Sequence, residues 1–457
     1  MNWLHDWDPE DRAFWERTGK RIANRNLWCS VFVEHIGFSV WTLWSVFVLF
    51  LGPEYGLSAG DKFLLVSLSS LVGALLRIPY SLAVARFGGR NWTVVSAASL
   101  LIPTVFAALV LHPGTPLWVF ALLAAAGGLG GGNFASAMAN INSFYPERAK
   151  GWALGIGAGG GNLGVAVIQL LALGVLAIAG TAADPRLLLW IYIPLIVLAT
   201  GLAVTRMDNI ARVRAEGNAM REVLRHGHTY LISLLYIGTF GSFIGYSFAF
   251  GLVLSSQFQQ SAVQAATVTF LGPLLGSLSR PLGGRLADRF GGAVISFGCF
   301  TLLAAATVLV LAASGTGSLG AYVCGFILLF VLSGIGNGSV YKMIPAIHAS
   351  AADRAIGAGA PVAASLATAR RHANALIGIA AAVGALGGVF INLAFRASFS
   401  ATGSGDPACY GFLGCYLLCA LLTWAVYLRG SVTRTQPRRS GADKSALHAD
   451  PEALEVH

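Results

Sequence analysis

Two arginines lie inside apolar runs of the chain at matching positions. Arg77 occurs in ALLRIPYSLAVARFGGR, nine residues before Arg86, and Arg280 occurs in GSLSRPLGGRLADRFGG, nine residues before Arg289. A guanidinium is planar, permanently charged and suited to bidentate contact with a planar oxyanion, and it does not carry protons. The pair therefore predicts a site for a small planar anion. A structural ion pair is the alternative, but only one acid, Glu34, lies deep in an apolar run.

The composition places these arginines in a membrane protein. The 457 residues are 56% hydrophobic and 11% charged, and the mean hydropathy is +0.69. Twelve apolar runs of membrane-spanning length follow one another, and most of the 30 Lys and Arg residues fall in alternate connections. This pattern predicts an all-α multi-pass protein of the cell inner membrane with both termini in the cytoplasm. It also explains the net charge of +10 without a nucleic-acid partner.

The order of polar and apolar segments predicts two halves. We expect a cytoplasmic N-terminal amphipathic segment (1–27), a first six-helix half (28–205), a central cytoplasmic loop (206–228), a second six-helix half (229–428) and a disordered cytoplasmic tail (429–457). The first segment should lie at the inner membrane surface with its Trp and Phe toward the lipid headgroups. Because the arginine motif occurs in both halves, we infer an internal duplication, a pattern typical of transporters with a midplane site.

Glycines and aromatic residues accompany the arginines. Small residues let membrane helices approach and slide, although simple packing is the alternative for many of them. The glycines in question are Gly131, Gly132, Gly159, Gly160, Gly161, Gly384 and Gly387. Tyr236 and Phe240 stand at i and i+4, which places them on one face of a helix. Taken alone, an aromatic pair at this spacing is typical of packing.

Three further ionisable residues lie in predicted spans. Glu34 and His35 fall in the first span and Lys342 in the tenth. A buried carboxylate can take up and release a proton, and a nearby ammonium modulates this exchange, so these residues are proton-coupling candidates. The alternatives are a static Glu34–Lys342 brace and, for His35, a packed neutral imidazole.

Several longer motifs resemble the nitrate/nitrite porter (NarK-type) family of the major facilitator superfamily. The motifs are NRNLW (24–28), LLRIPYS (75–81), GGGNFASAMANINSFYP (130–146), SLLYIGTFGSFIGYS (233–247), AAVGALGGVF (381–390) and LLTWAVY (421–427). The resemblance covers nearly the whole chain. It implies the superfamily fold, with twelve transmembrane helices in two pseudo-symmetric six-helix halves, and we expect a monomer in the lipid bilayer.

The resemblance also implies a binding site for nitrate or nitrite between the halves. In such a site Arg77 and Arg280 pair with the anion from opposite sides. Phe134, Tyr236 and Phe240 sandwich the flat anion, and Asn162 donates a hydrogen bond.

The resemblance further indicates secondary active transport by alternating access. The Glu34–His35 pair resembles a feature of the proton-coupled branch of this family, so we favour proton-coupled nitrate symport; nitrate/nitrite antiport is the alternative.

The stretch GGRLADRFGG resembles the superfamily's cytoplasmic latch motif, and four residues would form that latch here: Arg86, Arg285, Asp288 and Arg289. Ala85 replaces the acid in the first copy, so a solvated turn is the other interpretation.

Other functions fit the sequence less well. Transport of phosphate or of an organic anion would need a more polar and roomier cavity than these aromatic residues suggest. A non-transporting receptor would need an output domain, and the glycine-rich stretches lie in predicted spans rather than after a strand, so no enzyme is predicted. The six cysteines contain no CxxC pair, and we expect neither a metal site nor a cofactor.

Overall fold

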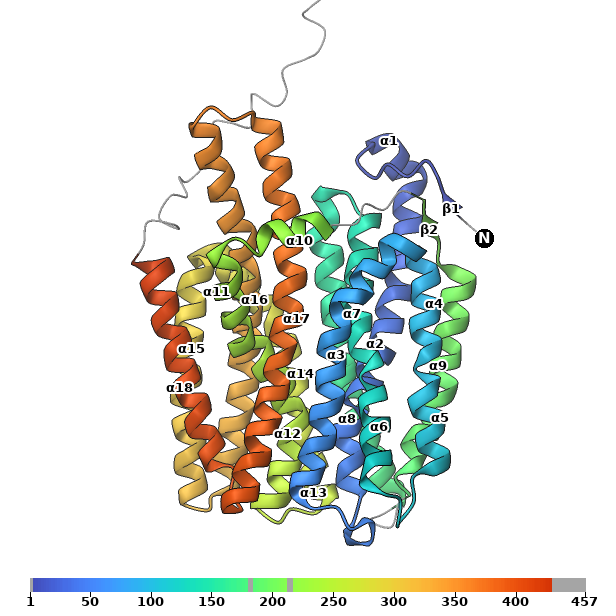
Figure 1. Cartoon of the computed structure of the whole chain (residues 1–457), viewed down its shortest axis with the longest axis vertical. Helices are drawn as coiled ribbons and strands as arrows, with labels where there is room; N and C mark the ends of the chain where they lie inside the picture. Colours follow the sequence, from blue (N-terminus) through green and yellow to red (C-terminus); the bar gives the residue numbers. More distant parts are fainter. Residues whose placement is uncertain (1–2, 180–183, 212–216, 430–457) are drawn as a thin grey trace, which may run out of the picture.

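The computed structural model describes residues 3–179, 184–211 and 217–429 and is almost entirely helical (Figure 1). The first half contains α2 (Lys20–Phe50), α3 (Ala59–Phe87), α4 (Gly89–Ser99), α5 (Leu101–Val110), α6 (Leu117–Gly127), α7 (Leu129–Phe144), α8 (Glu147–Ala179) and α9 (Arg186–Arg206). The second half contains α11 (Gly227–Tyr236), the π-helix η3 (Ile237–Gly241), α12 (Ser242–Gln257), α13 (Ala262–Thr269), α14 (Leu271–Phe290), α15 (Gly292–Gly315), α16 (Leu319–Gly357), α17 (Val362–Thr402), α18 (Asp406–Leu422) and η4 (Thr423–Leu428). The shorter elements are β1 (Trp3–Leu4), α1 (Arg12–Phe14), η1 (Trp15–Gly19), η2 (Pro53–Tyr55), β2 (Asn209–Ile210) and α10 (Gly217–Val223).

Within the part of the chain that the structure describes, twelve helical segments are long and apolar enough to cross a membrane, as the sequence predicts. The chain is thus a multi-pass membrane protein with an all-α fold. Several predicted spans consist of two consecutive helices, such as α4 with α5 and α6 with α7. In Figure 1 the helices of each half stand side by side, and α16 and α17 project together beyond the others at the end that carries α10. We call this end the α10 end and the opposite one the α13 end.

The two copies of the RFGG sequence form the same turn. Gly88 directly follows α3 with φ 89° and ψ 146°, and Gly291 directly follows α14 with φ 91° and ψ 136°. L-residues with a side chain rarely adopt this conformation, so each turn requires glycine at that position. The repeated sequence therefore reflects a repeated backbone geometry at the α10 end of both halves.

The N-terminal segment folds onto the protein, and the prediction that its Trp faces lipid headgroups is wrong. Trp15 is only 4% exposed and packs edge-on against Tyr145 at 5.5 Å between ring centroids. Trp7 contacts Phe144 in the same way, and β1 pairs with β2 of the central connection. Burial against other aromatic rings removes more apolar surface from water than an interfacial position would.

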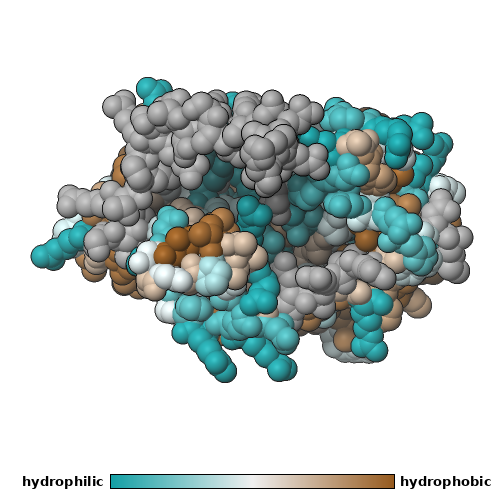
Figure 2. Space-filling view, turned by 90° about the horizontal axis from the view of Figure 1, so that it is seen from above, coloured by the Kyte–Doolittle hydropathy of each residue, from teal (hydrophilic) through white to brown (hydrophobic). Residues whose placement is uncertain are grey.

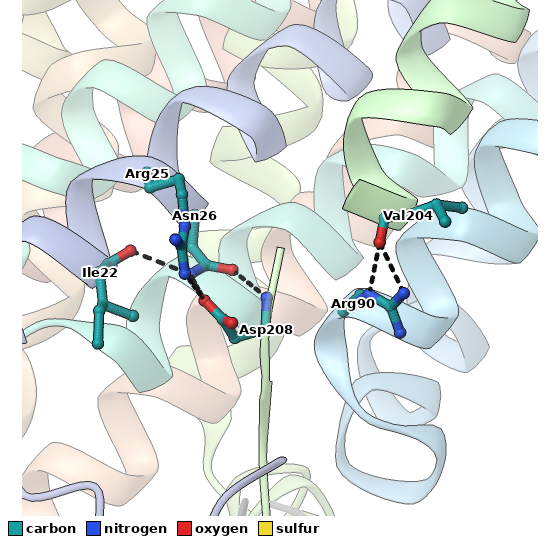
Figure 3. Close-up of polar contacts among 6 residues, drawn as sticks. All are labelled: Ile22, Arg25, Asn26, Arg90, Val204 and Asp208. Atoms are coloured by element: carbon teal, nitrogen blue, oxygen red, sulfur yellow. Dashed lines mark hydrogen bonds and ion pairs between the residues drawn. The ribbon is translucent and has the colours of Figure 1, made fainter. Parts of the chain in front are cut away.

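The central connection is held by a buried carboxylate (Figure 3). Asp208 is 2% exposed and accepts hydrogen bonds from Arg25 Nη2 at 2.5 Å and Asn26 Nδ2 at 2.9 Å. Its own backbone N–H donates to Asn26 Oδ1 at 2.9 Å. Nearby, Arg90 caps the end of α9 by donating from Nε and Nη2 to the carbonyl of Val204. These contacts tie the start of α2 to the exit of α9.

Replacing Asp208 with alanine should therefore lower the stability of the first half by about 2 kcal/mol, because Arg25 and Asn26 lose a charged partner. The apparent melting temperature of detergent-purified protein measures this loss. Asp184→Ala is a matched control, because the Arg186–Asp184 pair at 2.7 Å has both side chains 40% or more exposed and should contribute at most about 1 kcal/mol. Equal melting temperatures for the two variants would contradict the structural role of Asp208.

The two halves contact one another closely at the α13 end. Phe63 of α3 stacks on Phe395 and Phe399 of α17, with ring centroids 5.9 and 5.3 Å apart. Gly251 of α12 lies against Leu49 of α2. Where Figure 2 colours the α10 end, many of the residues are hydrophilic. The apolar contacts between the halves named above lie at the opposite end.

Candidate functional site

Arg77 is buried where the two halves meet. Its side chain is 1% exposed, and Nη1 donates to the carbonyl of Ala381 in α17 at 3.2 Å. Nε and Nη2 have no hydrogen-bond partner among the described residues. A buried guanidinium with two unsatisfied N–H edges is costly unless a ligand completes it. The free edge of Arg77 is therefore a candidate for anion binding.

Aromatic rings from both halves enclose this guanidinium. The Arg77 Cζ atom lies 4.7 Å from the centroid of Phe134 in α7 and 4.9 Å from that of Phe240 in η3. The Phe134 and Phe240 rings are themselves 6.4 Å apart with an interplanar angle of 30°. The cation thus lies in a buried, apolar environment, in which electrostatic attraction to an anion is stronger than in water.

A stack of rings links Arg77 to Arg280. Phe240 lies parallel to Tyr236, with centroids 5.4 Å apart and planes 17° apart, so the two rings share one side of the helix as their spacing predicts. The Tyr236 hydroxyl accepts a hydrogen bond from Arg280 Nη2 at 3.2 Å. The π-helix η3 begins directly after Tyr236 and contains Phe240, a local geometry that often occurs at functional sites.

Arg280 offers a second open donor. Its Nη1 is buried without a hydrogen-bond partner among the described residues, although the residue as a whole is only half-buried. The structure therefore brings together both arginines, Phe134, Tyr236 and Phe240, with unpaired N–H groups from each half. Arg77 forms the buried side of this site and Arg280 the more accessible side.

The glycines of α17 allow the helix to approach η3. A Cβ atom at Gly387 would lie 2.7 Å from the Cα of Gly241, and one at Gly384 would collide with the ring of Tyr236. In the first half, Gly131 packs on Trp41 and Gly132 on Tyr80. Close backbone contact of this kind needs small residues, so these glycines fix the walls that hold the aromatic rings.

One of the three consecutive glycines of α8 packs against Glu34. A Cβ atom at Gly161 would collide with the Glu34 carboxylate, and Gly160 lies against Val31, whereas Gly159 has no neighbour within 4 Å. Asn162 follows directly and is 1% exposed, with its Oδ1 lacking a hydrogen-bond partner in the described part of the chain. The unpartnered atom is an acceptor, so the predicted hydrogen bond to an anion would have to come from Nδ2 of this amide.

Glu34 itself is fully buried and unsatisfied. It is 0% exposed, and neither carboxylate oxygen has a hydrogen-bond partner among the described residues. It lies within Coulombic range of both Arg77 and Arg280. His35 points elsewhere, because its Nδ1 contacts the carbonyl of Gly160 at 3.0 Å. Glu34 therefore shares the electrostatic environment of the arginines, and His35 is tied to α8.

Lys342 does not join Glu34 in this structure. Its side chain is 49% exposed, and its Nζ pairs with Asp288 at 2.9 Å. The predicted Glu34–Lys342 pair is therefore absent here, because Lys342 lies toward the α10 end of the long helix α16, where an acid of α14 is within reach. The other predicted latch residues, Arg86, Arg285 and Arg289, are exposed at the same end. Asp288 pairs with Lys342 of α16 rather than with one of these arginines, which lie in α3 and α14.

Comparison with known proteins identifies the family. Residues 27–391 match the model of the Major Facilitator Superfamily. The chain belongs to the major facilitator superfamily. Its fold also resembles those of solved transporter structures. The crystal structure of a D-xylose–proton symporter aligns with a TM-score of 0.64 at 16% identity, over 88% of this chain and 95% of that one. An inward-facing bacterial homologue of the lysosomal transporter Spinster aligns with a TM-score of 0.63 at 17% identity, over 89% of this chain and 97% of that one.

Relatives with higher identity place the chain within this superfamily. It is 40% identical over 446 residues to the nitrate/nitrite transporter NarU of Escherichia coli (strain K12), covering 93% of this chain and 96% of that protein. It is 31% identical over 454 residues to the probable nitrate/nitrite antiporter NarK2 of Thermus thermophilus, covering 93% and 97%. The predicted NarK-type family is thereby confirmed, as is the prediction of a transporter rather than an enzyme.

The sequence alone did not reveal every residue of the site in this superfamily member. Tyr341 of α16 lies with its ring centroid 5.4 Å from Arg280 Cζ, and Trp41 and Phe38 of α2 flank Arg77 at 5.5 and 5.9 Å. Tyr341 directly precedes Lys342, which lies in a predicted span, and this position could have marked Tyr341 as a candidate site residue. Aromatic residues are so frequent in α2 that no spacing distinguishes Trp41 and Phe38 from ordinary core residues.

Proposed function

We propose that this chain carries nitrate and nitrite across the cytoplasmic membrane by alternating access of its two halves. The observation that supports the substrate best is the buried Arg77 guanidinium, which has two unpartnered nitrogens and lies beside the rings of Phe134 and Phe240. A planar anion with several oxygens fits donors in a plane between flat walls. The nitrate/nitrite transporters among the relatives favour the same substrate.

In this proposal Arg77 and Arg280 hold opposite edges of the anion, and Phe134, Tyr236 and Phe240 hold its faces. Asn162 supplies a further hydrogen bond from α8. The α10 end faces the cytoplasm, together with both termini, because the Lys and Arg residues gather in the connections there. The tail expected to be disordered (429–457) lies, apart from its first residue, outside the described residues. We expect the transporter to act as a monomer.

For coupling we favour symport of nitrate with protons through Glu34. A carboxylate that is buried, unsatisfied and within Coulombic range of both arginines can change protonation as the site fills and opens. Nitrate/nitrite exchange is the second candidate, since the Thermus thermophilus relative is named as a probable antiporter. In that case the incoming anion alone neutralises the arginines during each crossing.

Counterflow in proteoliposomes tests both the substrate and the coupling. Vesicles are loaded with nitrate, nitrite, chloride or phosphate, labelled nitrate is added outside, and the pH gradient is set independently. We expect counterflow with nitrate or nitrite inside and none with chloride or phosphate. Symport predicts nitrate accumulation when the outside is acidic, even in vesicles without internal anion. Uptake that needs internal nitrite and ignores the pH gradient would favour exchange, and no nitrate uptake at all would overturn the proposed function.

A further inference from the structure

Helix α16 contacts α14 at three successive points around Arg280. Gly338 packs on the backbone of Arg280, where a Cβ atom would collide with the carbonyl oxygen. Three residues later, the Tyr341 ring lies 5.4 Å from Arg280 Cζ. The next residue, Lys342, pairs with Asp288, two turns further along α14. Residues 338–342 of α16 therefore contact α14 at the backbone of Arg280, at its guanidinium and at Asp288 near the end of that helix.

Helices α14 and α16 pack closely against one another beside Arg280. Glycines on both sides bring the backbones together, with Gly283 against Ile335 and Gly338 against Gly284. Ser279 Oγ donates to the carbonyl of Val331 at 2.9 Å. Small residues and an interhelical hydrogen bond are the usual means of fixing helix pairs in membranes. A ring that projects from this surface is accordingly well placed to orient a neighbouring side chain.

The two halves supply corresponding rings to their arginines. Phe134 of α7, the fourth span, faces Arg77 of the second span at 4.7 Å. Tyr341 of α16, the tenth span, faces Arg280 of the eighth span at 5.4 Å. Tyr341 also lies 5.7 Å from the ring of Tyr236, whose hydroxyl binds the same guanidinium. Arg280 is thus set between two tyrosines, with Nη1 left free.

We propose that Tyr341 is a positioning residue for Arg280, and that the Lys342–Asp288 ion pair holds Tyr341 in register. This role rests on the proposed anion site. The ring of Tyr341 restricts the guanidinium to the orientation in which Nη1 points to the anion. Lys342 then acts by anchoring α16 on α14, and it carries no proton in the transport cycle. Its exposed side chain runs over Gly284 to reach Asp288, which fits an anchor at the surface.

The first test compares two replacements of Tyr341. Tyr341→Phe keeps the ring and should keep the KM for nitrate, whereas Tyr341→Leu removes the ring and should raise KM about tenfold with a smaller change in kcat. Tyr410→Leu is the matched control, because Tyr410 of α18 is 64% exposed. An unchanged KM in a folded Tyr341→Leu variant would overturn the positioning role.

The second test exchanges the charges of the ion pair. Lys342→Asp and Asp288→Lys should each raise KM about two- to fivefold, and the double variant should restore it, because an exposed pair contributes modestly. If Lys342→Gln instead abolished nitrate accumulation in a pH gradient with KM unchanged, Lys342 would be a proton-coupling residue and the proposal would be wrong.

Measurements on the wild-type protein distinguish failure of the proposed function from failure of the Tyr341 proposal. Its uptake is measured first with nitrate, nitrite and a panel of other small anions. Absence of nitrate uptake contradicts the proposed substrate alone. The KM of whichever anion is carried then decides the role of Tyr341 by the same comparison of the Phe and Leu variants.

Discussion

Replacing Arg77 with lysine should lower nitrate uptake roughly 100-fold, although the positive charge is kept. The Arg77 Cζ lies 4.7 Å from the Phe134 centroid and 4.9 Å from the Phe240 centroid, and the guanidinium donates to the carbonyl of Ala381 and leaves two further N–H edges for the anion. An ammonium is a compact point charge without a planar fork, so it cannot stack between the rings and contact two oxygens at once. Initial rates of labelled nitrate uptake in proteoliposomes measure the effect.

Two controls separate this loss from misfolding. Arg186→Lys changes an exposed arginine at the start of α9 that is paired with Asp184, and should leave uptake close to wild type. Arg77→Met removes a buried and incompletely paired charge, so it should abolish uptake without lowering the apparent melting temperature. Arg280→Lys should also impair uptake severely. Wild-type uptake in a folded Arg77→Lys protein is the outcome that would refute the anion site.

Replacing Glu34 with glutamine should abolish nitrate accumulation driven by an acidic exterior while leaving nitrate counterflow largely intact. The substitution keeps the shape of the side chain but removes the group that can be charged in one state and neutral in another. Because Glu34 is 0% exposed, lacks hydrogen-bond partners among the described residues and feels both arginines, its charge should depend on whether the anion is present. Accumulation ratios at fixed pH gradients, together with counterflow rates, measure the two activities separately.

The matched control for Glu34 is Glu222→Gln in α10. This glutamate lies at the α10 end, where hydrogen bonds from His372 and Arg371 hold the pKa of its carboxyl below the usual range. Its partners Arg371 and His372 are not among the residues of the anion site, so accumulation should persist. Accumulation that survives Glu34→Gln would exclude Glu34 as the proton carrier and favour nitrate/nitrite exchange.

Much of the architecture could be predicted from the sequence because a membrane restricts the backbone conformations that a spanning segment can adopt. Every span must be a helix about 20 residues long, so apolar runs reveal the helices, and basic residues reveal which connections lie together. Duplication adds a second constraint, since Arg77 and Arg280 could be recognised as a pair before any contact was known. Tyr236 and Phe240 followed from helical spacing, which depends only on local geometry.

Partners across the helix interfaces were decided by the tertiary structure. Arg77 binds the carbonyl of Ala381, which is 304 residues away in the chain, and no local pattern encodes that distance. Trp15 looked like a headgroup anchor but packs on Tyr145. The spacing of residues along one helix fixes which side chains share a face, whereas the identity of the facing helix depends on packing summed over the whole bundle.

The same distinction applies to the ionisable residues. The sequence by itself determined that this is a twelve-span protein with two arginines in matching places and one deep carboxylate, because buried charge is rare enough in a membrane to stand out. Only the tertiary structure decided that Lys342 pairs with Asp288 and not with Glu34, and that Tyr341 faces Arg280. Those contacts depend on where α16 lies along α14, and that register is set by glycine contacts between helices distant in the sequence.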